Sequence, residues 1–239
     1  MTIIIPSAGL GKRFHTDTPK PLLEVVDGKP MLQVVLENIA QDPSHRVIVT
    51  ILQEHDLKHN LADKILSFAN VDVKILPVLT DGPACTVAQT IQACNVNRND
   101  ELIVTNCDQV IEDFNMSNFL RFCHRNNYDG VIGTFFCPNA KNSFVKMNDR
   151  GLVTEAREKQ IISEYATNGF HYWKYAGDFE GSFFEMIEAH DTAMGEYYIS
   201  HSYNYLIQDG KRIGTYHFNE HYPIGIPEDL EKYRSIKNG

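Results

Sequence analysis

Residues 2–21 read TIIIPSAGLGKRFHTDTPKP, and this stretch decides how the rest of the chain is interpreted. Its first four residues form a short apolar run of the kind found in buried β-strands. A loop follows that contains Gly9 and Gly11 and ends in Pro19-Lys20-Pro21. Glycine lets backbone amides approach a ligand closely, and the cations of the loop suit an anion. The stretch therefore predicts a strand followed by a phosphate-binding loop.

Strands and helices are expected to alternate along the first half of the chain. The expected strands are residues 3–5, 46–52, 71–76 and 102–105, and the expected helices are residues 31–39, 56–69 and 84–94. Such alternation is typical of βαβ units, so we predict an α/β fold with a mainly parallel, Rossmann-like central sheet flanked by helices. Ligands of such sheets bind beyond the carboxyl ends of the strands, where the opening loop and Asp108 both lie.

The second half of the chain is less regular. Strands are expected at residues 130–137, 143–147 and 152–156, with a turn at 148–151, and helices at 179–189, 197–207 and 228–236. The turn predicts a β-hairpin added to the main sheet. No linker-like segment separates the halves, so we predict a single domain over residues 1–239.

The composition limits the classes of function. A net charge of −9 argues against nucleic-acid binding, which needs a positive surface, but it allows a small anionic ligand held by local cations or a metal ion. No run of about 18 apolar residues is present, so no membrane span is expected. The five cysteines are odd in number and include no CxxC pair, so a disulfide framework is not expected. This favours a location in the reducing cytoplasm.

The opening loop could belong to one of three kinds of phosphate-binding loop. In the dinucleotide-binding pattern GxGxxG the third glycine is replaced by Phe14, and the spacing GxxxxGK[ST] of a P-loop is absent. A glycine loop that wraps a triphosphate fits best, because Arg13 can fork onto two phosphate oxygens and Lys20 follows a rigid proline. The plain alternative is a glycine-rich surface turn with solvated cations.

The segments SAGLGKRF (residues 7–14) and TPKPLLEVVDGKP (residues 18–30) resemble the opening motif of the sugar-1-phosphate nucleotidyltransferases. Five later segments resemble that family's motifs in the same order: TDGPACTVAQTI (80–91), VTNCDQV (104–110), EAREKQIISEYATNGFHYW (155–173), GEYYISHSYNYLIQDGKRI (195–213) and IGIPEDLEKY (224–233). The forms GPACTV and NCDQ of two of these motifs most resemble those of enzymes encoded with capsule or surface-polysaccharide genes.

This resemblance implies an Mg²⁺-dependent nucleotidyltransferase. Such an enzyme moves an NMP from an NTP to the phosphate of a small acceptor, most often a sugar 1-phosphate, and releases pyrophosphate. The acceptor phosphate is already an anion near neutral pH, so catalysis needs alignment and charge neutralisation rather than a general base. Residues 1–110 would form the NTP-binding half and residues 111–239 the acceptor-binding half.

The resemblance also implies roles for individual residues. The catalytic residues would be Arg13 on the β- and γ-phosphates, Lys20 between the α-phosphate and the acceptor phosphate, and Lys159 on the acceptor phosphate. Asp108 would hold Mg²⁺, a cation that prefers carboxylate oxygens. The implied nucleotide-binding residues are Ala8, Gly9, Leu10, Gly11, Lys12, Arg13, Gly82, Pro83 and Ala84. Those implied to bind the acceptor are Glu158, Lys159, Asn168 and Gly169.

One position departs from the family. Pro223 stands where many members carry a second metal-binding carboxylate, so Glu220, His221 or Glu196 would have to substitute, or Asp108 would act alone with water and phosphates. Because of this missing carboxylate, a second function stays possible: a protein that binds a nucleotide without turnover. A cytidylyltransferase that acts on phosphocholine or a phosphorylated amide such as phosphoglutamine is another alternative. A glycosyltransferase is less favoured, because residues 108–110 are not DxD.

Several candidate residues also have purely structural interpretations. Asp108 could cap the element after its strand, and Glu158 with Lys159 could be a solvated surface pair. Tyr197, Tyr198, Tyr203 and Tyr205 are expected to pack in a helix, His55 and His59 to lie on an exposed helix face, and Cys107 to fill buried space. The compact Gly82–Ala84 segment favours a pyrimidine nucleotide such as CTP.

Overall fold

The computed structural model of the protein describes residues 1–112, 114–137, 139 and 141–238. The chain forms two compact units, each built from separate segments. The first unit comprises Met1–Ile4, Thr80–Thr105 and Ser117–Asn219, and the second comprises Ile5–Leu79, Asn106–Met116 and Glu220–Gly239. The boundary falls inside strand β1 (Thr2–Pro6). The division into NTP-binding and acceptor-binding halves at residue 110 is functional and stays a prediction.

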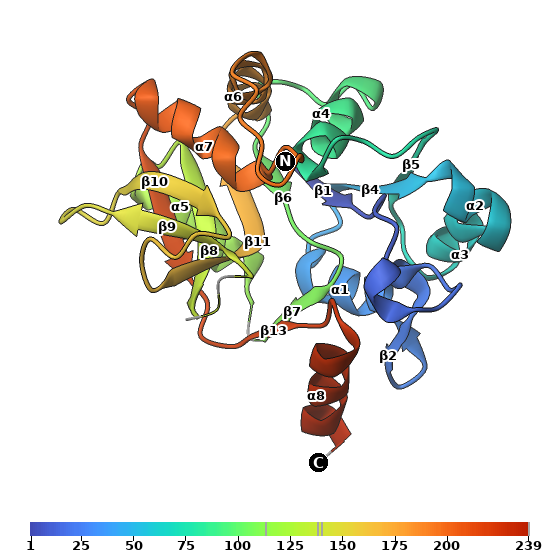
Figure 1. The fold of residues 1–239 in the computed structure, drawn as a ribbon. Coiled ribbons are helices and arrows are strands. Elements are labelled where there is room, and N and C mark those ends of the chain that lie inside the picture. Colours follow the sequence, from blue (N-terminus) through green and yellow to red (C-terminus); the bar gives the residue numbers. More distant parts are fainter. Residues whose placement is uncertain (113, 138, 140, 239) are drawn as a thin grey trace. The chain divides into compact units, whose positions relative to one another are not determined.

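The sheet of the first unit combines parallel and antiparallel strands. Its strands beside the start of β1 are β6 (Leu102–Val104), β8 (Gly130–Phe136), β9 (Ser143–Met147), β10 (Val153–Glu158), β11 (Tyr165–Trp173) and β12 (Ile213–His217). The pairs β1–β6 and β12–β8 are parallel, while β11 runs antiparallel to β6, β8 and β9. The predicted hairpin is present as β9 and β10, and β10 is the edge strand (Figure 1).

Helices α4 (Pro83–Ala93), α6 (Ala176–Glu188) and α7 (Ile199–Gln208) belong to the first unit, together with all of α5 (Met116–Arg125) after its first residue. Helix α7 packs against α6 and β10 (Figure 1). Aromatic rings fill the space between these helices and β11: Tyr203 stacks on Trp173 with ring centroids 4.8 Å apart, and Phe179 meets Trp173 edge-on at 5.0 Å. Burial of each such ring stabilises the unit by roughly 2–3 kcal/mol.

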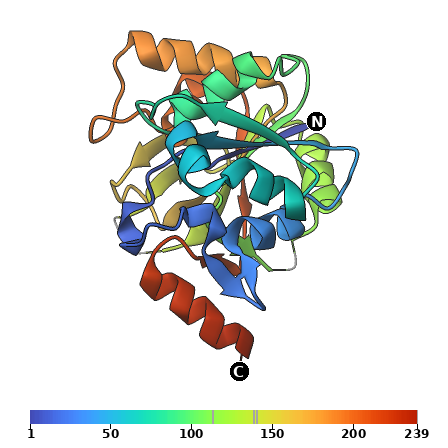
Figure 2. The same cartoon turned by 90° about the vertical axis from the view of Figure 1, so that its right-hand side faces the viewer.

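The second unit is built around the parallel pair β4 (Arg46–Leu52) and β5 (Asp72–Leu76). Helices α2 (Gln53–His59) and α3 (Leu61–Phe68), coloured cyan, pack against these strands (Figure 2). The remaining elements are the short helices η1 (Lys12–Phe14) and η2 (Lys20–Leu22), strands β2 (Glu24–Val26), β3 (Lys29–Pro30), β7 (Gln109–Ile111) and β13 (His221–Pro223), and helices α1 (Met31–Ile39) and α8 (Pro227–Asn238).

The core of the second unit joins segments that lie far apart in the sequence. Met31 of α1 packs with Val110 of β7 and Ile224, which follows β13, and Tyr233 of α8 belongs to the same cluster. Helix α1 can do this because its apolar residues recur at helical spacing and because Pro30 at its N-cap already has the fixed φ that a helix start accepts. These contacts hold β7 and β13 in place, and β7 begins directly after Asp108.

The predicted α/β class, with parallel strands, flanking helices and an added hairpin, is confirmed. The expected helix at residues 31–39 and the strand at residues 46–52 match α1 and β4 at both ends. The single helix expected over residues 56–69 is wrong. Asn60 adopts a left-handed conformation with φ 52° and separates α2 from α3, and Leu57 is 78% exposed instead of facing the core.

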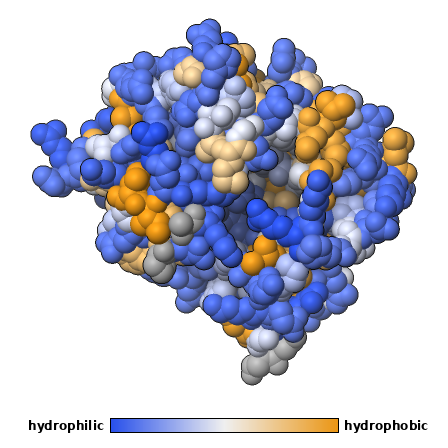
Figure 3. Space-filling model, in the orientation of Figure 1, coloured by the Kyte–Doolittle hydropathy of each residue, from blue (hydrophilic) through white to orange (hydrophobic). Residues whose placement is uncertain are grey.

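The surface is mostly hydrophilic on the face drawn in Figure 3, where hydrophobic residues form small separate groups. Leu57, Val78 and Met194 are among the large apolar side chains that are exposed. Across the part of the chain that the structure describes, no helix is both long and apolar enough to cross a membrane.

Candidate active site

The opening loop presents its backbone and its cations to solvent. The Ser7 amide donates to Thr50 O at 2.7 Å, and Ala8 packs against Leu52 and Leu76, so the loop leaves the sheet from a fixed point. Leu10, Lys12 and Arg13 are exposed. Gly11 has a φ of 62°, a left-handed conformation that favours glycine, and it leads into η1. A loop of this kind can offer amides and charged side chains to a polyanion, while Ala8 could contribute only its backbone.

Lys20 and Asp108 form an ion pair in the second unit, although 88 positions separate them in the sequence. The Lys20 ammonium donates to Asp108 Oδ2, and the two side chains are 19% and 21% exposed. Burial acts to lower the pKa of Lys20, but the charge and hydrogen bond of Asp108, together with Cys107, act to raise it, and overall this pKa is raised. Lys20 therefore stays cationic at neutral pH. The carboxylate binds a side chain rather than the next backbone amides, which argues against a purely capping role for Asp108.

Gly225 makes room for this ion pair. Strand β13 pairs with β7, and the Ile224 amide donates to Asp108 O at 2.8 Å, so Gly225 is held beside the Asp108 side chain. A Cβ atom at Gly225 would lie 3.1 Å from Asp108 Cγ, closer still to Oδ2, and 3.5 Å from Lys20 Nζ. The space that a side chain would fill at this position is taken by the carboxylate.

Cys107, Gln109 and His221 near Asp108 are neutral, and the first two are buried. Cys107 is 7% exposed and burial raises its pKa, so the thiol stays protonated, in agreement with the expected space-filling role. His221 Nε2 and Gln109 Oε1 lie 3.0 Å apart. Burial lowers the pKa of His221 to about 4, although the Asp108 charge opposes this shift. The strongest fixed charges at this point are therefore those of Lys20 and Asp108.

The donor set at Asp108 fits Mg²⁺ held mainly by substrate. No group of three or more His, Cys, Asp or Glu residues that could bind a metal ion is found among residues 1–112, 114–137, 139 and 141–238. Mg²⁺ is commonly bound by one or two carboxylates together with phosphates and water, and Asp108 supplies one carboxylate. Pro223 pairs with Gln109 and offers no side-chain ligand. Among the three suggested substitutes, the pKa of His221 is lowered by burial and partly raised again by the Asp108 charge, and Glu196 belongs to the first unit.

Glu158 is the last residue of β10 in the first unit and Lys159 follows it, and the two are not a solvated surface pair. Glu158 is 7% exposed, and its carboxylate accepts a hydrogen bond from the Ser143 hydroxyl. Lys159 Nζ lies 3.7 Å from Glu158 Oε1, donates to the Tyr198 hydroxyl at 3.3 Å and sits over the Tyr198 ring at 5.3 Å. Tyr198 therefore does more than pack in the helix. Sequence reasoning missed its contact with Lys159.

Asn168 and Gly169 occupy an irregular stretch of β11, where the pairing with β8 shifts between Thr167 and His171. Asn168 is 5% exposed, and its Oδ1 accepts the Phe170 amide at 3.1 Å. Among the described residues, its buried Nδ2 has no hydrogen-bond partner. A buried amide donor without a partner is costly and suits a ligand hydroxyl.

The Gly82–Ala84 segment is tightly packed. Gly82 has a φ of 127°, and a Cβ atom there would lie 2.6 Å from the backbone N and O of Tyr197. The Tyr197 amide donates to Asp81 O at 2.8 Å, and Tyr197 O accepts from Ala84 at 3.1 Å. The side chain of Ala84 is fully buried. Gly82 is therefore required by packing, and the segment can meet a ligand mainly through its backbone and Pro83.

The structure gathers the predicted residues into separate groups. Gly9, Gly11, Arg13, Lys20 and Asp108 belong to the second unit, whereas Gly82–Ala84, Glu158, Lys159, Asn168 and Gly169 belong to the first. Tyr203 is fully buried, as expected for packing. His55 and His59 are half-buried rather than exposed.

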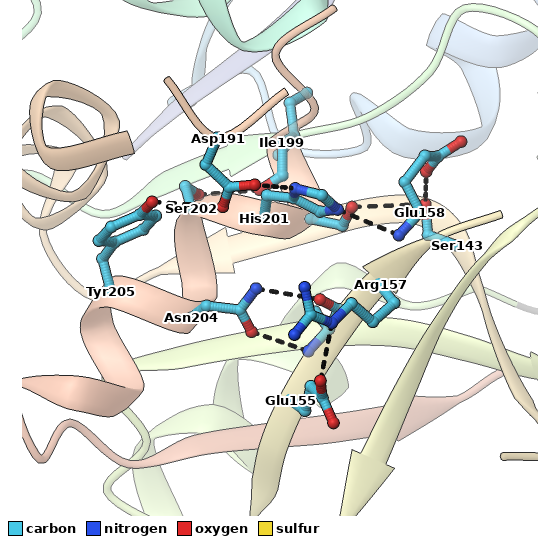
Figure 4. Close-up of polar contacts among 12 residues, drawn as sticks. Ser143, Glu155, Arg157, Glu158, Asp191, Ile199, His201, Ser202, Asn204 and Tyr205 are labelled. Carbon is cyan, nitrogen blue, oxygen red and sulfur yellow. Dashed lines mark hydrogen bonds and ion pairs between the residues drawn. The ribbon is translucent and has the colours of Figure 1, made fainter. Parts of the chain in front are cut away.

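Sequence reasoning missed Ser143 and His201, which contact Glu158, and Asp191, which contacts His201 (Figure 4). His201 is 43 positions from Glu158, and no local pattern links the two.

Comparisons with known proteins show the family and the fold of the chain. A family model described as nucleotidyl transferase matches residues 2–233. The nucleoside-diphosphate-sugar pyrophosphorylase of Vibrio cholerae RC9 superposes with a TM-score of 0.85 over 98% of this chain and 99% of that one, at 22% identity. A UDP-glucose pyrophosphorylase complexed with UDP-glucose superposes with a TM-score of 0.77 over 99% and 98%, at 17% identity. At these identities the likeness shows a shared fold.

A shorter match links the chain to the bifunctional protein GlmU of Bordetella petrii. The two are 41% identical over 51 residues. This stretch is 21% of the chain and only 11% of the GlmU protein.

Proposed function

Because the chain belongs to the nucleotidyl transferase family, we propose that it transfers an NMP from an NTP to the phosphate of a sugar 1-phosphate and releases pyrophosphate. The observation that carries the proposal is the Lys20–Asp108 ion pair, which lies in the same unit as the exposed glycine loop. Both solved neighbours are named as nucleotide-sugar pyrophosphorylases, which supports a sugar phosphate as acceptor.

In the proposed reaction an acceptor phosphate oxygen attacks the α-phosphorus of the NTP. The new P–O bond forms as the bond to the β-phosphate oxygen breaks, and pyrophosphate leaves with that electron pair. Lys20 stays cationic, and we assign it to the α-phosphate, where negative charge must be neutralised during attack. Arg13 is exposed, and its positive charge opposes the rise in the pKa of Lys20, so the two cations lie close enough to interact. We assign Arg13 to the leaving pyrophosphate.

Asp108 would hold Mg²⁺ together with the substrate phosphates. When bound, the ion supplies further neutralisation of phosphate charge. Asp108 is already paired with Lys20, so the carboxylate links the cationic side chain to the place where the metal would lie. The single carboxylate supports Mg²⁺ rather than a softer metal.

Acceptor recognition is assigned to the first unit. Lys159 would bind the acceptor phosphate, and the buried Glu158 carboxylate would accept from acceptor hydroxyls. The unpartnered Asn168 Nδ2 supports a further hydrogen bond to the acceptor next to Gly169. These groups suit a small polar molecule that carries one phosphate.

Further assignments concern the nucleotide base, the cellular compartment and the biosynthetic role. The close packing of Gly82–Ala84 against Tyr197 supports a small base and hence a pyrimidine nucleotide such as CTP. The five free cysteines support a reducing cytoplasm. The role in capsule or surface-polysaccharide synthesis rests on the resemblance of the GPACTV and NCDQ segments.

The test is release of pyrophosphate in the presence of Mg²⁺. CTP, UTP, dTTP, GTP and ATP are each combined with sugar 1-phosphates, phosphocholine and phosphoglutamine. We expect release that requires both substrates and is strongest for one pyrimidine nucleotide with one sugar 1-phosphate. Pyrophosphate release with phosphocholine or phosphoglutamine, but with no sugar 1-phosphate, would show that the proposed acceptor is wrong. Binding of an NTP without release for any pair would refute turnover.

A further inference from the structure

The end of β10 carries Glu158 and Lys159, and this strand is the edge of its sheet. It pairs with β9 on one side only. An edge strand leaves every second N–H and C=O without a strand partner. At Ala156 and Glu158, two positions apart on the strand, these groups point toward α7, which packs along β10.

Two side chains of α7 take the place of the missing strand. The Asn204 amide accepts from Ala156 N at 2.8 Å and donates to Ala156 O at 3.0 Å. His201 Nε2 accepts from the Glu158 amide at 3.1 Å. The two side chains are three residues apart and so lie on one face of the helix. Figure 4 shows both of them directed at the strand.

Asp191 determines which nitrogen of His201 is free to accept. His201 Nδ1 lies 3.1 Å from Asp191 Oδ1, and an ionised carboxylate can only accept, so Nδ1 carries the hydrogen. Nε2 of the neutral ring then has a lone pair for the Glu158 amide. The Tyr205 hydroxyl donates to Asp191 Oδ2 at 3.3 Å, which holds the carboxylate in place (Figure 4). His201 is 5% exposed, so this connection is shielded from water.

We infer that His201, oriented by Asp191, is a positioning residue that fixes the end of β10 and thereby directs Glu158 and Lys159 toward the acceptor. The strand ends at this point: Lys159 has a left-handed φ of 53°, and its amide donates to Asn142 O at 3.0 Å. The His201 bond fixes the residue before this turn. Loss of that bond lets the turn move and misplaces both side chains. This role rests on the proposed function.

The experiment compares His201→Leu with Asn204→Leu in the full chain. Asn204 is the matched control, because it also links α7 to β10, makes two hydrogen bonds with the strand, and lies away from Glu158. KM and kcat for NTP and acceptor, the free energy of unfolding, and hydrogen exchange at the Glu158 amide are measured for both. His201→Gln tests rescue, since its amide oxygen can accept from Glu158.

We expect His201→Leu to raise the acceptor KM about tenfold, the factor that one lost hydrogen bond can produce, with the NTP KM changed less than about twofold. The Glu158 amide should exchange faster in His201→Leu, and His201→Gln should recover part of the acceptor KM. Asn204→Leu should lose as much stability with an acceptor KM near that of the wild type. Equal rises of acceptor KM in both variants, or unchanged exchange at Glu158 in His201→Leu, would overturn the inference.

A separate result distinguishes failure of the proposed function from failure of the inference about His201. If the wild-type protein releases no pyrophosphate with any substrate pair, the proposed function is wrong and the acceptor-positioning role falls with it. Hydrogen exchange at Glu158 still reports in that case whether His201 holds the strand end.

Discussion

The space at Gly225 gives the sharpest prediction, because a single methyl group there collides with the central ion pair. In Gly225→Ala the new Cβ would lie 3.1 Å from Asp108 Cγ and closer still to Oδ2, whereas ordinary van der Waals contact begins at 3.4 Å. The backbone at Gly225 cannot easily move, because the amide of the preceding Ile224 donates a hydrogen bond to Asp108 O and its side chain is buried in the core. The carboxylate must therefore move by about 1 Å from its present position, which disturbs its contact with Lys20.

Two costs follow from that movement. A weakened charge-assisted hydrogen bond costs about 1.5–3 kcal/mol, and local overpacking costs about 1–3 kcal/mol. The two side chains are mostly buried, so solvent screens the pair only weakly. We expect the free energy of unfolding to fall by roughly 2.5–6 kcal/mol. Turnover should fall about 100-fold, because a displacement of about 1 Å in a catalytic group has effects of that size.

The assays are urea unfolding and pyrophosphate release. Gly181→Ala in α6 is the control, since nothing lies within 4 Å of the added Cβ and alanine favours the helix by up to about 1 kcal/mol. The control should keep wild-type activity and equal or higher stability. Wild-type turnover in Gly225→Ala would refute the claim that the placement of Asp108 against Lys20 matters for catalysis.

Three further predictions concern charge. Lys20→Met should destabilise the protein by about 1–3 kcal/mol near neutral pH. The pKa of Lys20 is higher in the folded protein than in the unfolded chain, so this stabilisation is present below the unfolded pKa and is lost as the pH rises through the folded pKa. Urea unfolding at increasingly alkaline pH should therefore show a shrinking difference between Lys20→Met and the wild type. Asp108→Asn should remove activity together with its response to added Mg²⁺; the exposed Asp63→Asn is the control, and an unchanged Mg²⁺ titration would place the metal elsewhere. Burial lowers the pKa of His171 to about 3, so the unfolded chain binds its proton first as pH falls and stability drops from about pH 6.5 downward. His171→Phe should reduce that slope in acid unfolding, and a slope equal to that of the wild type would contradict the assignment.

Local patterns explain what the sequence alone could predict. The helix at Met31–Ile39 and the strand at Arg46–Leu52 follow from periodicity and from Pro30, which act within a few residues. The opening loop was recognisable because two glycines and a proline-flanked lysine directly follow a strand. The same logic failed at Asn60, since hydrophobic spacing does not reveal a left-handed residue that divides one helix into two.

Long-range contacts account for what the sequence could not predict. The approach of Lys20 to Asp108 spans 88 positions, and the pairing of β13 with β7 joins residues more than 100 positions apart. Gly225 matters only because that pairing brings it to Asp108. In the same way, His201 gains its contact with Glu158 from the packing of α7 along an edge strand. Such long-range contacts cannot be predicted from the periodicity or spacing of residues in the sequence.

The most direct test of the account follows phosphorus through one turnover by ³¹P NMR. The protein, Mg²⁺, an NTP and a sugar 1-phosphate are mixed, and all phosphorus-containing products are quantified. The account predicts equal amounts of pyrophosphate and a nucleoside diphosphate linked to the sugar, with none formed by Lys20→Ala. Free NMP with pyrophosphate, NDP with inorganic phosphate, or an unaltered NTP in every mixture would contradict nucleotidyl transfer by this chain.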